Sequence, residues 1–267
     1  MATQEQSVFD VEWFDPIMAG RIAVPIGVLV AWELLSIWLG SALLPGPEDT
    51  LAVIQQGIGA GWIVGNLQNT MITLAVGFLI SVAGGLALGM VLGFVQSAFD
   101  VFEIYVLSTY SVPKIVLYPI FLFIFQLGMD TKIAFGAAHG LFPMLIITMG
   151  AIREIDEIYK KVARSLQMGR WQLFRHIVFP FILVQLVVAL RLAFSLTFLG
   201  VILAELFASK SGLGLILQHA MANFNTGRIM AVVTILMVIA IIGNLFFYAA
   251  QRVLERRWNM TANTGGI

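Results

Sequence analysis

The stretch Lys161–Pro180, KVARSLQMGRWQLFRHIVFP, has the polarity of a soluble segment but lies between long hydrophobic segments. Six of the chain's 15 Lys and Arg residues lie in or just before it: Arg153, Lys160, Lys161, Arg164, Arg170 and Arg175. A short basic insert between membrane spans is typical of the cytoplasmic side of a membrane. We therefore interpret it as a cytoplasmic loop and as a candidate docking element for another protein.

The composition of the chain indicates an integral membrane protein. Hydrophobic residues make up 60% of the 267 positions and charged residues 11%, whereas a soluble domain has about 25% charged residues. The formal net charge is zero, which argues against a nucleic-acid partner. The first eighteen residues contain four acidic residues and no base, so they lack the basic region of a secretory signal.

Hydrophobic segments of about 20 residues or more predict an all-α fold, a polytopic membrane helix bundle with six transmembrane helices. The expected spans are residues 20–44, 67–96, 103–126, 131–151, 181–206 and 229–251. Residues 1–19 and 259–267 are expected to be tails, and 20–258 a single transmembrane domain that contains the basic loop, 152–180. Residues 45–66 are too polar and Gly-rich to span, and we expect an external interfacial helix there.

The distribution of Lys and Arg predicts that both termini are cytoplasmic. In that orientation ten bases lie on the inner side (Arg21, the six loop residues, Arg252, Arg256 and Arg257) and three on the outer side (Lys132, Lys210 and Arg228). Lys114 and Arg191 remain inside spans.

Charged and polar residues inside the spans are candidates for a translocation pathway, because such residues usually face protein or water. Arg191, Ser195 and Glu205 share one face of the fifth span. This face is either a stripe that lines the pathway or part of a structural pair with another span. Lys114 either lines the pathway or extends its ammonium to the membrane surface. Because Pro113 and Pro119 flank it, we expect the third span to be irregular.

Three further features of the sequence concern helix packing, metal binding and ATP hydrolysis. Gly85, Gly89 and Gly93 form two overlapping GxxxG steps, which predict close helix packing. The three His residues are too dispersed for an obvious metal site. The chain has no Gly-Lys-Ser/Thr phosphate loop, so any ATP hydrolysis would belong to another chain.

The basic loop itself predicts a helix from about Asp156, a break at Gly169, and a second helix leading into the fifth span. Asp156 and Glu157 suit the start of the first helix, where acidic side chains are favoured, and Glu157 is placed to pair with Lys161. Gly169 suits the left-handed position after a helix. The alternative is an ordinary basic loop that only sets topology.

The loop resembles the cytoplasmic loop of ABC-importer permeases, whose pattern is Glu-Ala-Ala, three residues, Gly, nine residues, Ile, one residue, Leu-Pro. Ala163, Ile177 and Pro180 match with every spacing kept. The chain departs from the pattern at four positions: Lys161, Val162, Gln167 and Phe179.

Residues 25–258 also resemble the nitrate/sulfonate/taurine permease group of binding-protein-dependent importers. The segments that carry this likeness are Pro113–Pro119, Phe125–Gly128, Lys132, Phe142-Pro143, Arg191–Ala193, Ala204-Glu205, Ser211–Gly214 and Leu254–Arg257.

The resemblance implies an inner-membrane permease subunit that moves a small solute by alternating access and is not itself an enzyme. It implies a second copy of the chain, two copies of a cytoplasmic ABC ATPase that hold the ATP and Mg, and an external or periplasmic binding protein. It also implies that the loop, a coupling helix between spans four and five, docks on the ATPase. The docking candidates are Lys161, Ala163, Arg164, Gly169, Ile177 and Pro180, with Ala163 on the contact side.

Two alternatives remain open. Lys114 and Arg191 suit an anionic substrate such as nitrate or a sulfonate, but Glu205 argues against an anion, and relatives of the group also take vitamin precursors. A different class, the ion-coupled secondary transporter, predicts internal repeats with paired broken helices. No second copy of the Pro113–Pro119 break is visible in the sequence.

Overall fold

The computed structural model describes the backbone of residues 16–264. The surroundings of the individual residues are described for positions 20, 23–159, 161–169 and 171–255. Every regular element in this range is helical. The elements are α1 (Pro16–Leu39), α2 (Pro47–Gly59), α3 (Trp62–Phe94), α4 (Gln96–Ser111), the 3-10 helix η1 (Lys114–Leu117), α5 (Tyr118–Phe125), α6 (Met129–Arg153), α7 (Glu157–Ser165), α8 (Arg170–Leu173), the π-helix η2 (Phe174–Val178), α9 (Phe179–Phe207), α10 (Leu213–Ala222) and α11 (Thr226–Thr264).

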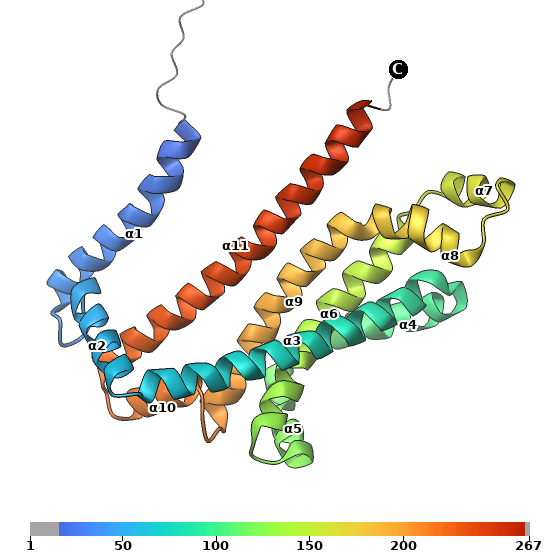
Figure 1. Cartoon of the computed structure of the whole chain (residues 1–267). Coiled ribbons are helices and arrows are strands. Elements are labelled where there is room, and N and C mark those ends of the chain that lie inside the picture. Colours follow the sequence, from blue (N-terminus) through green and yellow to red (C-terminus); the bar gives the residue numbers. More distant parts are fainter. Residues whose placement is uncertain (1–15, 265–267) are drawn as a thin grey trace, which may run out of the picture.

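Three long helices, α3, α6 and α9, form the packed centre of the molecule, and α11 lies against α9 (Figure 1). The short helices α2 and α10 lie at one end of this bundle, and α7 and α8 lie at the other. The start of α1 and the end of α11 point toward the end that holds α7 and α8. The bundle therefore has two structurally different ends, as expected of a protein whose ends face opposite sides of a membrane.

The most extensive helix contact, between α3 and α6, depends on the glycine stripe. A Cβ atom at Gly85 would lie 2.6 Å from the backbone oxygen of Leu141, and one at Gly89 would lie 2.7 Å from the Thr148 Cβ. At Gly93 it would lie 2.8 Å from the Ile152 Cβ. Larger residues would push the helices apart, so the predicted close packing of this stripe is confirmed.

Four helices of the described chain are long and apolar enough to cross a membrane: Trp62–Phe94, Met129–Arg153, Trp171–Phe207 and Thr226–Glu255. The α4–α5 region adds a fifth crossing if its bent parts count as one span. The described apolar part of α1, Ala23–Leu39, is shorter. The fold is thus an all-α membrane bundle, while the count of six spans stays a prediction.

The third expected span is broken, as its prolines predicted. The chain bends by 89° between α4 and the segment Lys114–Phe125, because Pro113 supplies no backbone N–H and disfavours a helical residue before it. The Tyr118 hydroxyl anchors the bent part by lying 3.0 Å from the backbone oxygens of both Ala204 and Ala208. The Ala204 oxygen also accepts from the Ala208 N–H at 3.3 Å, whereas the Ala208 oxygen lies at the C-terminal cap of α9, beyond the last helical bond.

Helix is present in the described parts of both expected tails, and the tail boundaries stay predictions. Helix α1 already begins at Pro16 and α11 continues to Thr264, so helix extends into both expected tails. The remaining tail residues, 1–15 and 265–267, lie outside the described residues.

Candidate functional site

The Glu205 carboxylate is held in a buried ion pair near the end of α9. Its Oε1 lies 3.3 Å from the Lys132 Nζ on α6, and the two side chains are 0% and 2% exposed. The Thr70 hydroxyl on α3 lies 3.1 and 2.9 Å from the two carboxylate oxygens. The Gly214 backbone N–H donates to Oε2 at 3.0 Å. One carboxylate thus joins α3, α6, α9 and the start of α10.

The loop Ser211–Gly214 wraps around this carboxylate, and its glycines make that possible. Gly212 has φ +115°, and a Cβ atom there would lie 2.0 Å from the Glu205 Oε1. The Gly212 N–H donates to the Asn66 Oδ1 at 2.8 Å, while the Lys132 Nζ donates to the Ser211 oxygen at 3.0 Å. The Ser-Gly-Leu-Gly motif is therefore a backbone cradle for Glu205.

The paired state of Glu205 bears on the charge of the membrane interior. The Lys132 ammonium and two further donors, the Thr70 hydroxyl and the Gly214 N–H, compensate its negative charge, and the Glu205 side chain is not exposed to solvent. Of the two readings for Glu205, the arrangement corresponds to a structural pair with another span. Removing one partner of such a pair leaves a buried charge and costs about 3–5 kcal/mol.

Lys114 lies at the bend between α4 and α5. Its Nζ lies 4.6 Å from the ring centre of Tyr110 and 5.0 Å from that of Phe142, and it donates to the Tyr110 backbone oxygen at 3.2 Å. Aromatic faces attract a cation. Among the described side chains no carboxylate pairs with it, so its positive charge remains uncompensated.

Arg191 and Ser195 lie midway along α9, next to α11. The Ser195 hydroxyl lies 3.1 Å from the Arg191 backbone oxygen and 3.3 Å from the Asn244 Oδ1. The Arg191 side chain is half-buried, and no hydrogen bond or ion pair joins its guanidinium to a described side chain. A second uncompensated positive charge therefore lies at membrane depth.

At the opposite end, α7 is a capped helix with an apolar outer face. The Asp156 side chain accepts from the Ile158 backbone N–H at 2.9 Å, and Glu157 pairs with Arg164 at 3.6 Å on the surface. Ile158, Val162 and Leu166 are 60%, 50% and 69% exposed. Their spacing of four residues places them along one side of the helix.

Ala163 does not lie on this outer face, which corrects the expected orientation of α7. It is 4% exposed and lines a depression together with Met168 and Leu173. Its small size lets α7 pack onto the following segment of its own chain. The outer face of α7 available to a partner is instead formed by Ile158, Val162 and Leu166.

The break between α7 and α8 is at Gln167 rather than at Gly169. Gln167 has φ +50°, and the Met168 N–H returns to the Ala163 oxygen at 3.0 Å, as in a helix that ends on a left-handed residue. Gly169 instead precedes α8, where its N–H donates to the Gln172 Oε1 at 2.9 Å. This is one half of a capping box. The helix–break–helix prediction is confirmed, but the expected role of Gly169 is wrong.

The second helix of the loop continues into α9 through the π-helix η2, so that Trp171–Phe207 is one helical rod. Ile177 lies in η2, and Pro180 follows directly after the π-turn, so that its missing backbone N–H falls at the irregular part of the rod. Lys161 and Arg164 are exposed on α7. This geometry joins the loop rigidly to a helix of the bundle centre.

Residues 85–260 match the model of a protein family described as the binding-protein-dependent transport system inner membrane component. The chain belongs to this family. Such proteins are inner-membrane permeases of ABC importers, and the reading as a secondary transporter is not favoured.

Several curated relatives of the permease are similar over most of their length. It is 30% identical over 237 residues to the aliphatic sulfonates transport permease protein SsuC of Escherichia coli (strain K12), covering 88% of this chain and 89% of that one. It is 27% identical over 239 residues to the protein of the same name from Bacillus subtilis (strain 168), covering 88% and 85%. It is also 27% identical over 230 residues to the nitrate import permease protein NrtB of Synechococcus elongatus, covering 79% and 78%.

The permease also has the fold of solved transporter chains. Two inward-facing crystal forms of the MetNI methionine ABC transporter superpose with TM-scores of 0.63 and 0.65 at 17% identity. The match covers 72% of this chain and 95% and 96% of those chains.

The candidate pathway residues of the permease do not form one cluster. Glu205 joins Lys132 in the buried pair, Ser195 joins Asn244, and Lys114 lies apart at the α4–α5 bend. Arg191 and Glu205 are 14 residues apart on α9, about 21 Å along its axis. Their roles in transport stay predictions.

Sequence reasoning missed Thr70, Asn66 and Asn244. Asn244 had a usable signal, since no other charged or amide side chain occurs between Arg228 and Gln251. Thr70 and Asn66 had none, because their contacts join segments more than 130 residues apart. Within the described residues, no group of three His, Asp or Glu side chains is arranged to hold a metal ion.

Proposed function

We propose that this permease carries a small oxyanion, a sulfonate or nitrate, into the cell. Two copies of the chain would form the pathway, with two copies of a cytoplasmic ABC ATPase and an external binding protein. The names of its relatives, aliphatic sulfonates and nitrate transport permeases, support the substrate class. ATP and Mg would be held by the ATPase and not by this chain.

The observation that carries the anion proposal is the pairing of Glu205. Unpaired, this carboxylate would repel an anion at the outer mouth of the pathway. Because Lys132, Thr70 and Gly214 compensate it, Arg191 is the uncompensated charge of α9 and Lys114 that of the α4–α5 bend, while the Glu33 carboxylate lies apart from both on α1. Arg191 is the better candidate to meet the substrate, since a guanidinium matches an oxyanion with two parallel hydrogen bonds.

The orientation follows from charge. The end that holds α7 and α8 (Figure 1) carries the basic loop, and it would face the cytoplasm with both chain termini. The end that holds α2 and α10 would face outward and receive the binding protein. In a bacterium with two membranes, this places the permease in the inner one.

The coupling proposal rests on α7 and on the continuous rod that follows it. The apolar stripe Ile158, Val162 and Leu166 is exposed next to cationic Lys161 and Arg164. Such a stripe on a polar helix suits a groove of another protein. Movement of α7 with the ATPase would pass through α8 and η2 into α9, the helix that carries Arg191.

The test is substrate uptake by proteoliposomes that contain the permease, its copurified ATPase and its binding protein. We expect ATP-dependent uptake of labelled alkanesulfonate or nitrate, and at least a tenfold loss with Arg191→Gln. Arg191→Lys should restore part of the uptake, because an ammonium keeps the charge but not the planar fork.

The matched control is Lys210→Gln, which removes an exposed base outside the spans and should leave uptake unchanged. Uptake of a neutral or cationic pyrimidine with no uptake of either anion would contradict the proposal. So would full activity of Arg191→Gln.

A further inference from the structure

The break between α4 and η1 lies near the middle of the membrane. The Nζ of Lys114, which follows the break, lies 5.0 Å from the ring centre of Phe142. Phe142 is 13 residues from the start of α6 and 11 from its end, about 20 and 17 Å along the axis. Since α6 is long and apolar enough to cross a membrane, the break is far from both membrane surfaces.

The backbone at this break has polar groups that the chain itself does not satisfy. Ser111, Val112 and Pro113 are exposed. No hydrogen bond joins the backbone N–H of Lys114 or of Ile115 to another group of the described chain. Irregular backbone at this depth is tolerated only where protein buries it or where it lines a water-filled cavity. The break is therefore unsuited to a lipid-facing surface.

The Lys114 ammonium favours water over protein at this position. It donates to the Tyr110 backbone oxygen at 3.2 Å, which uses one of its three N–H donors. Two donors remain, and no carboxylate within the described part of the chain pairs with the ammonium. A charge that protein buries without a partner is costly, whereas water or an anion can accept from both free donors.

The position of the ammonium argues against a place at the membrane surface. The Lys114 side chain turns back onto α4, where its Nζ lies 4.6 Å from the Tyr110 ring centre. The segment that follows, Lys114–Phe125, runs at 89° to α4. Cation–π attraction to the rings of Tyr110 and Phe142 keeps the charge at the depth of the break. Lipid head groups do not reach this depth, so an anion there would come from solution.

Helix α4 has further polar side chains that lead to the break. Asp100, Glu103 and Ser111 are three and eight positions apart, which places them along one side of the helix. Charged side chains inside a span usually face protein or water. Glu103 precedes Ser111 by about 12 Å along the axis, toward the end that holds α7 and α8 (Figure 1). The positive charge is thus confined to the break.

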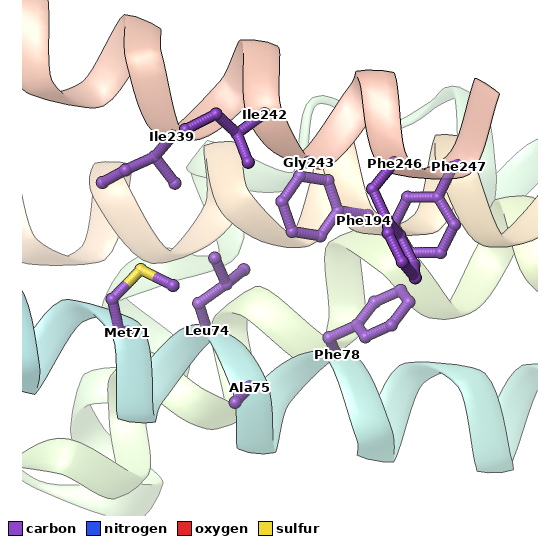
Figure 2. A pocket seen from close by; sticks show the side chains of 10 residues that line it. All are labelled: Met71, Leu74, Ala75, Phe78, Phe194, Ile239, Ile242, Gly243, Phe246 and Phe247. Atoms are coloured by element: carbon purple, nitrogen blue, oxygen red, sulfur yellow. The ribbon is translucent and has the colours of Figure 1, made fainter. Parts of the chain in front are cut away.

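A groove of about 480 Å³ between α3 and α11 is the alternative course for a solute (Figure 2). Its lining comes from three helices and is entirely apolar: Met71, Leu74, Ala75, Phe78, Phe194, Ile239, Ile242, Gly243, Phe246 and Phe247. An oxyanion in this groove would lose its hydrating water and find no hydrogen-bond donor in exchange. The groove is therefore unsuited to an anion, in contrast to the break.

We propose that the break between α4 and η1 lines the water-filled translocation pathway, and that the Lys114 ammonium binds the oxyanion there through its two free N–H donors. The inference rests on the proposed function, which supplies the anion and the second copy of the chain. Each copy contributes one Lys114 to the pathway. Lys114 is then a substrate-binding residue in addition to Arg191.

The first test reads the surroundings of the break in the full-length permease with its copurified ATPase, in lipid nanodiscs. The chain has no native Cys, and Ser111→Cys should react with water-soluble methanethiosulfonates. Ala83→Cys on α3 is the matched control and should not react. Ala83 is also exposed, and its depth is similar, since a Cβ atom at the adjacent Gly84 would lie 3.2 Å from the side chain of Leu141.

The second test reads the charge at the break. Ser111→Cys should react faster with a sulfonate reagent than with a trimethylammonium reagent, and Lys114→Gln should lower this rate ratio about tenfold. Lys114→Arg should retain the ratio. In proteoliposomes, Lys114→Gln should lower ATP-dependent anion uptake about tenfold, as expected for the loss of a hydrogen bond to a charged group.

Two labelling results would overturn the inference. A Ser111→Cys variant that reacts with neither reagent would mean that protein or lipid covers the break. A rate ratio unchanged by Lys114→Gln would mean that the ammonium does not face the pathway. Labelling is read without substrate, so its failure is distinguishable from failure of the anion proposal, which is read by uptake.

Discussion

At the residue scale, the buried Lys132–Glu205 pair sets the electrostatics of the permease. It joins three helices and a loop through one carboxylate. Because both side chains are excluded from water, either one left alone would be a buried charge without compensation. This makes the pair a sensitive test of the described packing.

We predict that Lys132→Met and Glu205→Gln each lower the free energy of unfolding by about 3–5 kcal/mol. The double variant should lose much less than the sum, because neither charge is then left alone. The measurement is a double-mutant cycle of unfolding in detergent. The exposed pair Glu157–Arg164 is the control, and its removal should cost about 1 kcal/mol or less. Additive losses for Lys132 and Glu205 would contradict the pairing.

The sequence could place Glu205 on a helix face but could not identify its partner. Lys132 is 73 positions away, and helix periodicity relates only residues within one helix. Local features were predictable, such as the Asp156 cap and the glycine stripe on α3. The break at Gln167 was not predictable, because the sequence carries no reliable local signal for a non-glycine residue with positive φ.

At the element scale, α7 is the part of the permease that we expect to meet the ATPase. The loop motif predicted that this helix exists, but it could not predict which side faces outward. That side is set by contacts between α7 and the segment after it, where Ala163 is buried against Met168 and Leu173. The proposed contact therefore involves Val162 rather than Ala163.

We predict that Val162→Asp weakens binding of the ATPase at least about 100-fold. A carboxylate buried in the contact without a partner costs several kcal/mol, and each 1.4 kcal/mol is tenfold in affinity. The measurement is copurification and titration of the ATPase with the permease. Val162→Thr, which keeps the shape without a charge, should bind normally. Undiminished binding of Val162→Asp would mean that this loop only sets topology.

The broken third span shows a similar division between local and distant causes. Pro113 predicted the break. After the 89° bend, the chain is also held by Tyr118, whose hydroxyl reaches Ala204 and Ala208 at the end of α9. That contact joins residues about 90 positions apart, so the sequence alone did not indicate it.

At the scale of the whole molecule, orientation is the property that the sequence predicts most directly, because it depends on summed charge. A single-cysteine assay suits a chain without native Cys. We predict that a membrane-impermeant maleimide added outside modifies Lys210→Cys and does not modify Leu166→Cys until the membrane is permeabilised. Gly212 is a poor reporter, since it is buried against Glu205. The reverse labelling pattern would invert the proposed orientation.

The structure of a single chain gives little information about how many copies assemble. The large apolar side chains of α1 are exposed along most of its described length, and its main contact among the described helices is with α2. Lipid or a second copy must cover this surface in the membrane, because an apolar helix has no other favourable surroundings there. The number of copies stays a prediction.

The most direct test of the account is the energy source of uptake in sealed proteoliposomes. We predict that labelled anion accumulates only when the permease, its ATPase, its binding protein and ATP are all present, and that an imposed proton or sodium gradient does not replace ATP. Accumulation driven by an ion gradient with the permease alone would contradict the account and indicate a secondary transporter.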